Sequence, residues 1–141
     1  MSAGAVYISK KVTFSSAHRM FNPGLSDEEN RGLYGKCANP GGHGHNYVLE
    51  VTMRGIPEER TGMVTNLDSL SGILMREIVE RFDHKDLNVD VEELRGNVTS
   101  LENLVRLIWR ILEPAMDEGS LYEVRLWENE NNCAWYRGDG N

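Results

Sequence analysis

The sequence predicts an α+β fold, in which a four-stranded antiparallel sheet carries two helices on one face. Three observations predict it: two early stretches alternate apolar and polar residues, two later stretches repeat apolar residues at helical spacing, and a pair of short strands closes the chain. The order is strand, strand, helix, helix, strand, strand. A length of 141 residues suits one domain, and we expect residues 1–141 to form it.

Two strands are expected in the first part of the chain. The first runs from Val6 to His18, and one of its faces carries Val12, Phe14, Ser16 and His18. The second begins at His43, and one face continues from two histidines into apolar residues: His43, His45, Tyr47, Leu49, Val51 and Met53. If these strands form a hairpin, the end of the first lies beside the start of the second. His18 then lies beside His43 and His45.

The connection between these strands, residues 19–42, is much longer than a median loop of roughly 4–6 residues. It is rich in glycine, proline, asparagine and acidic residues. Loops of this length are usually functional or disordered, so the segment is a candidate for part of a site.

Two helices are expected in the middle of the chain. The first has Thr65 or Asn66 as its cap, ends at Asp83-His84, and has this apolar stripe: Leu67, Leu70, Leu74, Ile78 and Phe82. The second begins at a predicted capping box, Thr99-Ser100-Leu101-Glu102, and is closed by Pro114. Its stripe is Leu101, Leu104, Val105, Ile108 and Leu112.

The last two strands are separated by an asparagine-rich turn, Asn129 to Asn132, after which Cys133 to Arg137 returns. One face of the first strand of this pair is predicted to carry Tyr122, Val124, Leu126 and Glu128. A sheet with two open edges is protected when subunits pair their edges and close a barrel. We therefore expect a homo-oligomer.

The composition excludes several functions. A net charge of −7 argues against general binding to nucleic acid or to an anionic membrane, so an acidic ligand needs a local basic cluster. Met1 to Lys11 lacks the pattern of a secretory signal, and no stretch reaches the roughly 18 apolar residues of a membrane span. The two cysteines are too few for a disulfide scaffold. We expect free thiols in a reducing compartment, the cytoplasm.

The histidines are the strongest candidates for chemistry. Residues i and i+2 of a strand point the same way, so His43 and His45 can face one ion, and the hairpin adds His18. Three neutral imidazoles suit zinc and leave a fourth position open, as in catalytic sites. A surface His-x-His pair and a hydrogen-bonded core histidine are the alternative.

Cys37 lies six residues before His43 in the glycine- and proline-rich connection. It could be a fourth zinc ligand, a thiolate acting as general base, or an inert buried thiol. Cys133, within a predicted strand, is expected in the core.

Further polar residues could complete a site. Asp83 could orient His84 as a proton carrier, although a charge pair at a helix end would look the same. Glu128 would face inward and bind the N–H pair of a heterocycle, unless it is exposed at an edge. A phosphorylated substrate would need some of the nearby cations: Lys10, Lys11, Arg19 and Lys36.

Several motifs together resemble the 6-pyruvoyl-tetrahydropterin synthase family. They are Phe14–Arg19, Leu25–Asn30, Gly35–Cys37, His43–Tyr47, Gly62–Val64, Asp83–Leu87, Glu102–Asn103, and Leu121–Tyr122 with Glu128. They follow one another in the family's order over nearly the whole chain. The Cys-x5-His-x-His spacing is similar to that of the pyruvoyl-forming branch, whereas the related 6-carboxy-tetrahydropterin synthases of the queuosine pathway typically have Cys-x3-His-x-His.

The resemblance implies a tunnelling fold, in which subunits pair their sheets into barrels, with active sites between subunits. It implies a homohexamer made of two trimers. The implied reaction converts dihydroneopterin triphosphate to 6-pyruvoyl-tetrahydropterin, on the route to tetrahydrobiopterin. The implied zinc ligands are His18, His43 and His45.

The resemblance also implies roles for other side chains. Cys37 would be the base, Asp83 and His84 its relay, and Glu128 the anchor of the pterin ring. The loop with Ser100 and Glu102 would line the pterin site, although Ser100-Leu101 replaces a threonine pair found in many relatives. Arg19 and Lys36 are the candidates for holding the triphosphate.

The implied reaction is an internal redox change. Zinc would act as a Lewis acid, Cys37 would remove a carbon-bound proton, and triphosphate would leave. No nicotinamide or flavin is needed, and the chain has no G-x-G-x-x-G motif. Two alternatives stay open: a 6-carboxy-tetrahydropterin synthase on the same fold, and a non-catalytic zinc- or pterin-binding module in which Cys37 closes the metal site.

Overall fold

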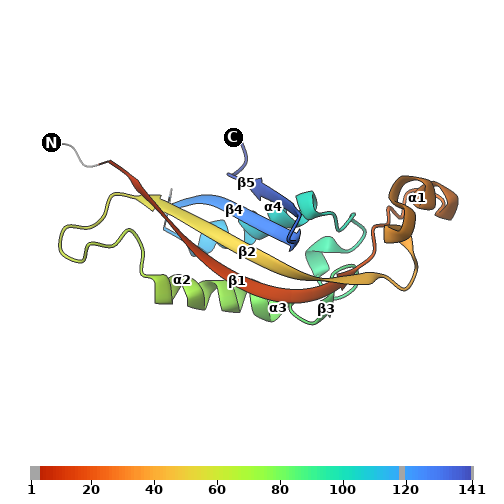
Figure 1. Cartoon of the computed structure of the whole chain (residues 1–141), viewed down its shortest axis with the longest axis horizontal. Coiled ribbons are helices and arrows are strands. Elements are labelled where there is room, and N and C mark those ends of the chain that lie inside the picture. Colours follow the sequence, from red (N-terminus) through yellow and green to blue (C-terminus); the bar gives the residue numbers. More distant parts are fainter. Residues whose placement is uncertain (1–3, 118–119, 141) are drawn as a thin grey trace.

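The computed structural model describes residues 4–117 and 120–140, and within them the strands form one sheet (Figure 1). Two long strands, β1 (Val6–His18) and β2 (His43–Gly55), form the predicted antiparallel hairpin. Strands β4 (Leu121–Asn129) and β5 (Asn132–Tyr136) follow on the other side of β2. The predicted α+β class is confirmed.

The prediction of four antiparallel strands was wrong by one strand. In the described residues the sheet has five strands in the order β3-β1-β2-β4-β5, and the short β3 (Lys85–Asp86) runs parallel to β1. The chain leaves the last helical turn and returns along β1, because the His84 N–H donates to Ser15 O at 2.6 Å and the Leu87 N–H donates to Ala17 O at 2.8 Å. A two-residue pairing has no alternation that a sequence pattern could show.

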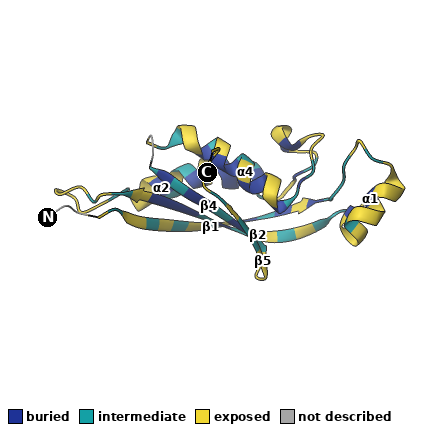
Figure 2. Ribbon diagram, turned by 90° about the horizontal axis from the view of Figure 1, so that it is seen from above, coloured by how far each residue is buried: buried dark blue, intermediate teal, exposed yellow. Residues whose placement is uncertain are grey.

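The predicted helices cover one face of the sheet (Figure 2). The first is one continuous run made of α2 (Leu67–Leu74), a π-helical turn η2 (Met75–Val79) and α3 (Glu80–Phe82). The second is α4 (Leu101–Leu112), followed by the turn η4 (Glu113–Ala115). Their predicted stripes are buried except for Leu67, which is 38% exposed. None of the helices in the described part of the chain is long and apolar enough to cross a bilayer.

The structure settles the N-terminal caps of α2 and α4. Asn66 rather than Thr65 caps α2, since its side chain accepts from the Ser69 N–H at 3.0 Å. The capping box predicted at Thr99 and Glu102 was wrong, because Ser100 is the cap and accepts from the N–H of Asn103. The carbonyl and hydroxyl of Thr99 are engaged elsewhere, at His18.

The connection 19–42 is not only loop. It contains the helix α1 (Asp27–Tyr34) and a 3₁₀ turn η1 (Gly35–Ala38). A true capping box starts α1, since Ser26 accepts from the Glu29 N–H and Glu29 accepts from the Ser26 N–H. This helix lies at one end of the molecule, beyond the sheet (Figures 1 and 2).

The alternation predicted for β4 holds from Val124 to Glu128 and fails before it. The pairing of β2 with β4 shifts register between Thr52 and Met53, so Leu121 faces the core in place of Tyr122. Tyr122 instead contacts Tyr7 on the open face of the sheet, with ring centroids 4.7 Å apart. A β-bulge moves every residue beyond it to the opposite face.

Candidate metal centre

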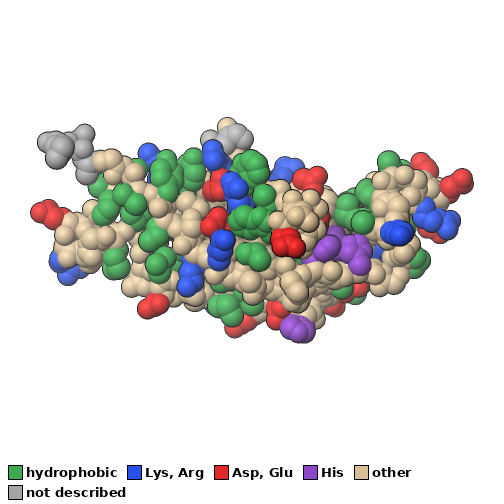
Figure 3. Space-filling model, viewed as in Figure 1, with side chains coloured by type: hydrophobic (Ala, Val, Ile, Leu, Met, Phe, Trp, Pro, Cys, Tyr) green, Lys and Arg blue, Asp and Glu red, His purple; other side chains and the backbone are tan. Residues whose placement is uncertain are grey.

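The hairpin brings three histidines together where β1 ends and β2 begins. His18 is paired directly with His43, and Ser16 with His45. One ring nitrogen from each of the three histidines lies within 4.8 Å of the others, which confirms the predicted juxtaposition. Figure 3 shows histidine side chains gathered beside an acidic side chain, between the sheet and the segment that carries α1.

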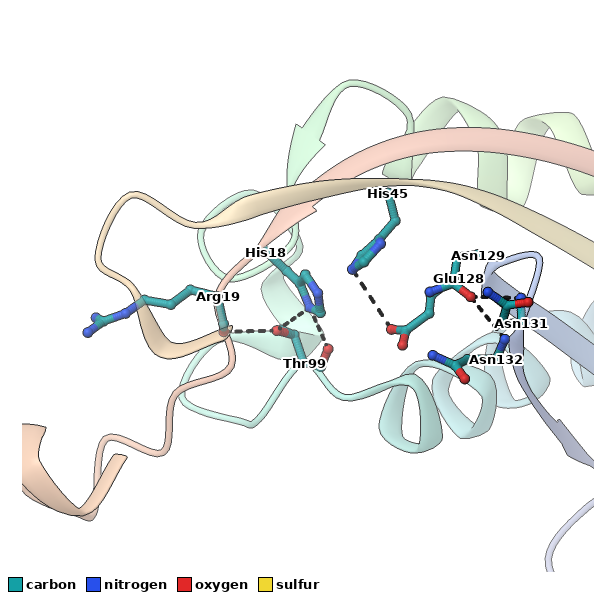
Figure 4. Close-up of polar contacts among 8 residues, drawn as sticks. All are labelled: His18, Arg19, His45, Thr99, Glu128, Asn129, Asn131 and Asn132. Carbon is teal, nitrogen blue, oxygen red and sulfur yellow. Dashed lines mark hydrogen bonds and ion pairs between the residues drawn. The ribbon is translucent and has the colours of Figure 1, made fainter. Parts of the chain in front are cut away.

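His18 is fixed by the residue that precedes α4. Its side chain is 2% exposed, and Nδ1–H donates to Thr99 O at 2.8 Å (Figure 4). This bond sets the tautomer and leaves the Nε2 lone pair free, and Nε2 is a buried atom without a hydrogen-bond partner among the described residues. Burial lowers the pKa of His18 to about 4, against the opposing effect of the Thr99 hydrogen bond. His18 is therefore neutral near pH 7.

Glu128 faces the same cluster from β4. Its Oε2 lies 3.9 Å from His45 Nε2, and the two side chains point toward each other in Figure 4. The pKa of His45 is lowered by burial, with Glu128 opposing that shift and His43 adding to it. The turn after Glu128 is held by the Asn129 side chain, which accepts from the N–H groups of Asn131 and Asn132 at 2.8 and 3.0 Å. The prediction of an inward-facing Glu128 is confirmed.

These residues fit a divalent metal ion. The donors are imidazole nitrogens, the type of ligand preferred by zinc and its neighbours in the transition series. The orphaned Nε2 of His18 needs a partner, and burying it without one costs free energy. Among the described residues, the metal-capable group contains three histidines and no fourth ligand. A three-histidine site leaves a coordination position open.

Gly42 controls how close β2 starts to His18. Its φ is +70°, and a Cβ added there would lie 3.0 Å from His18 O, whereas one added at Gly41 would meet nothing within 4 Å. Replacing Gly42→Ala should destabilise the protein by about 1–2 kcal/mol, because the left-handed conformation is strained for alanine. It should also weaken metal binding several-fold by displacing His18. Urea unfolding and metal titration measure both effects, with Gly41→Ala as the control; equal behaviour of the two variants would contradict the prediction.

Cys37 is exposed and lies in η1, so the interpretation as an inert buried thiol was wrong. It is not in the metal-capable group. Backbone bonds nevertheless tie this turn to the end of β1: the Met20 N–H donates to Cys37 O at 2.8 Å, and Arg19 Nε donates to Ala38 O at 2.7 Å. The turn that carries Cys37 is therefore held against the residues that directly follow His18.

Two of the four candidate phosphate-binding cations, Arg19 and Lys36, lie around this turn, whereas Lys10 and Lys11 lie in the middle of β1, paired with Val51 and Glu50. The Arg19 side chain extends away from His18 in Figure 4, and its guanidinium lies 4.0 Å from the centroid of the Phe21 ring. Lys36 is exposed on η1. Neither side chain belongs to the histidine cluster. Lys36 lies in the same turn as Cys37, and Arg19 is hydrogen-bonded to that turn at Ala38 O.

Asp83 and His84 form a direct pair at the edge of β1. His84 Nδ1 donates to Asp83 Oδ2 at 2.8 Å, and His84 has a positive φ of 58°. Asp83 also accepts from the Ser15 N–H at 2.8 Å, and these two hydrogen bonds lower its pKa, the Ser15 bond most. The His84 side chain is 83% exposed. The pair is thus preorganised, but within one chain it is not part of the histidine cluster.

Ser100 and Glu102 lie at the start of α4, directly after Thr99. The Ser100 hydroxyl accepts from the Asn103 N–H at 3.2 Å and so serves the helix, while Glu102 is exposed in the first turn. The cluster includes neither. Cys133 is partly buried in β5, so its expected place in the core is correct only in part.

Sequence reasoning missed the residues that support His18. Thr99 is fully buried and holds the imidazole, and Asn88 clamps the next residue through two hydrogen bonds: the Arg19 N–H donates to Oδ1 at 2.7 Å, and Nδ2 donates to Arg19 O at 2.9 Å. These contacts join residues far apart in the chain, so no local sequence pattern predicts them. The alternation in β2 predicted the correct face for Tyr47 but not its contact with the histidines.

The fold and the site together define an α+β protein with a metal-capable centre of three histidines. The family model for 6-pyruvoyl tetrahydropterin synthase matches residues 7–139. The chain belongs to this family, as the resemblance in its motifs had indicated.

Individual relatives agree with the family. The chain is 46% identical over 134 residues to a 6-pyruvoyl tetrahydrobiopterin synthase of Dictyostelium discoideum, an alignment that covers 95% of this chain and 97% of the relative. It is 42% identical to the human protein of that name, with 94% and 91% covered. The solved structure of Caenorhabditis elegans 6-pyruvoyl tetrahydropterin synthase superposes with a TM-score of 0.93 at 35% identity, covering 98% of this chain and 99% of that one.

Proposed function

We propose that this enzyme converts 7,8-dihydroneopterin triphosphate to 6-pyruvoyl-tetrahydropterin and triphosphate, in tetrahydrobiopterin biosynthesis. The observation that carries the proposal is the cluster of three imidazoles beside Glu128, in a chain that relatives named for this activity match over nearly their whole length. The reaction moves protons and electrons within one molecule, so it consumes no external oxidant or reductant.

The ion that we propose for the cluster is zinc, held by His18, His43 and His45. Zinc bound there would polarise the oxygens of the substrate's side chain and acidify the neighbouring C–H bonds. The carboxylate of Glu128 would bind the N–H pair of the pterin ring, as carboxylates bind paired donors. A ring fixed in this way keeps its side chain beside the histidines.

Cys37 is proposed as the base that takes a proton from the substrate's side-chain carbon. Its exposure and its backbone tie to the segment after His18 support this role. His84 would carry a proton, with Asp83 fixing its tautomer through the 2.8 Å bond. We place Ser100 and Glu102 at the rim of the pterin site, and Arg19 and Lys36 with the triphosphate.

The exposed position of the Asp83–His84 pair supports an active site shared between subunits. Two edges of the sheet are available for pairing, β5 on one side and the part of β1 not covered by β3 on the other. Large apolar side chains are exposed on both strands, including Tyr7 at 52% and Trp135 at 53%. We propose that subunits join these edges into a barrel and assemble as a homohexamer of two trimers, each chain being one domain.

The cellular setting that we propose is the cytoplasm. Cys37 and Cys133 are both free, and a thiol acting as a base must stay reduced.

The activity is tested directly by incubating the zinc-loaded protein with 7,8-dihydroneopterin triphosphate. We expect stoichiometric release of triphosphate, measured by ion chromatography, and a product with the mass of 6-pyruvoyl-tetrahydropterin. A 6-carboxy product would instead identify the queuosine-type activity on the same fold. Zinc and pterin binding without triphosphate release would identify a non-catalytic module and overturn the proposal.

A further inference from the structure

Tyr47 carries a polar atom that the protein around it does not satisfy. Its side chain is 0% exposed, and its hydroxyl is one of two buried side-chain atoms without a hydrogen-bond partner in the described residues. The other is His18 Nε2, which a metal ion explains. An unpartnered buried hydroxyl costs roughly 1–3 kcal/mol, so it needs an explanation of its own.

The Tyr47 ring is fixed beside the histidine cluster. It stacks on Phe14 with centroids 5.0 Å apart and 15° between planes, which limits its movement. Its centroid lies 5.6 Å from that of His45 and 6.5 Å from that of His18, both edge-on. Tyr47 therefore lies on the same face of β2 as the site and contacts two of the three imidazoles.

The hydroxyl can act as a donor there. A phenol hydroxyl has one proton to donate, and no described residue accepts it. A ligand group that accepts a hydrogen bond from this O–H is an oxygen of the ligand. The N–H groups of the ligand would instead donate to the carboxylate of Glu128, as proposed above.

We infer that the Tyr47 hydroxyl donates a hydrogen bond to a side-chain oxygen of the ligand bound at the histidine cluster. The inference rests on the proposed function, which makes that ligand a pterin with an oxygenated side chain. Tyr47 then contributes to recognition of the side chain, while Glu128 recognises the ring. A site built around a buried donor rejects analogues that lack the matching acceptor.

The test compares two pterins in the zinc-loaded protein: biopterin, whose side chain carries hydroxyl groups, and 6-methylpterin, whose side chain carries none. Tyr47→Phe removes only the hydroxyl. We expect it to weaken biopterin binding about fivefold or more, as measured by calorimetry, and to leave 6-methylpterin binding unchanged. Zinc content and the melting temperature of the ligand-free protein should not fall, because the removed atom has no partner in that state.

The control is Tyr122→Phe, which removes the same atom on the open face of the sheet, where Tyr122 contacts Tyr7. It should bind both pterins as the wild type does. Equal weakening of both pterins by Tyr47→Phe, or of neither, overturns the inference and leaves the proposed function intact. Failure of the wild type to bind biopterin overturns the inference, whereas absence of triphosphate release from 7,8-dihydroneopterin triphosphate overturns the proposed function.

Discussion

Replacing His43→Gln should lower zinc affinity by more than about 100-fold and abolish turnover. Loss of a residue that only supports a ligand typically costs 10–100-fold, and loss of a ligand should cost more. His43 is a better target than His18 because it is only partly buried, so the fold should tolerate glutamine there. Chelator competition followed by metal analysis measures the affinity, and the triphosphate-release assay measures turnover.

The matched control is His84→Gln, which changes the one histidine outside the cluster. It should keep a full equivalent of zinc and lose turnover, since its proposed role is proton transfer and its side chain is largely exposed. If His43→Gln retains zinc as tightly as the wild type does, the three-histidine centre is wrong.

The part of this site that the sequence could predict depends on strand geometry. Alternation placed the three histidines on the core faces of β1 and β2, and a hairpin brings the end of one strand to the start of the next. Both rules are local, so one sequence suffices. The helical stripes that cover the sheet follow from the same kind of periodicity.

Other features depend on contacts that periodicity does not encode. The β3 pairing directly follows His84, which has a positive φ, and the bulge in β4 adds a residue that reverses the face of Tyr122. The support of His18 by Thr99 spans 81 positions in the chain. The helix α1 is different, because its capping box at Ser26 and Glu29 was a readable signal that the loop-like composition obscured.

One chain holds all three histidines of the metal-capable cluster, whereas the proposed relay of Asp83 and His84 lies outside that cluster. The cluster and Glu128 lie on the core face of the sheet, whereas Asp83 accepts from the backbone N–H of Ser15 at the edge of β1 where β3 pairs. Preorganising His84 at an exposed edge is useful if a neighbouring subunit supplies the substrate. On the proposed site shared between subunits, turnover would require assembly, whereas metal binding would not.

Replacing Cys37→Ala should abolish turnover while leaving zinc bound. General base catalysis contributes about 10²–10⁴-fold, so the rate of triphosphate release should fall at least by that range. The protein should remain folded, because Cys37 is exposed and surface substitutions usually change the free energy of unfolding by less than about 0.5 kcal/mol. Single-turnover assays and metal analysis on the same sample separate the two effects. Cys133→Ala, which removes the other thiol, should preserve both zinc and turnover. Loss of zinc from Cys37→Ala would instead show that the sulfur closes the metal site, and would remove the basis for a catalytic centre with an open position.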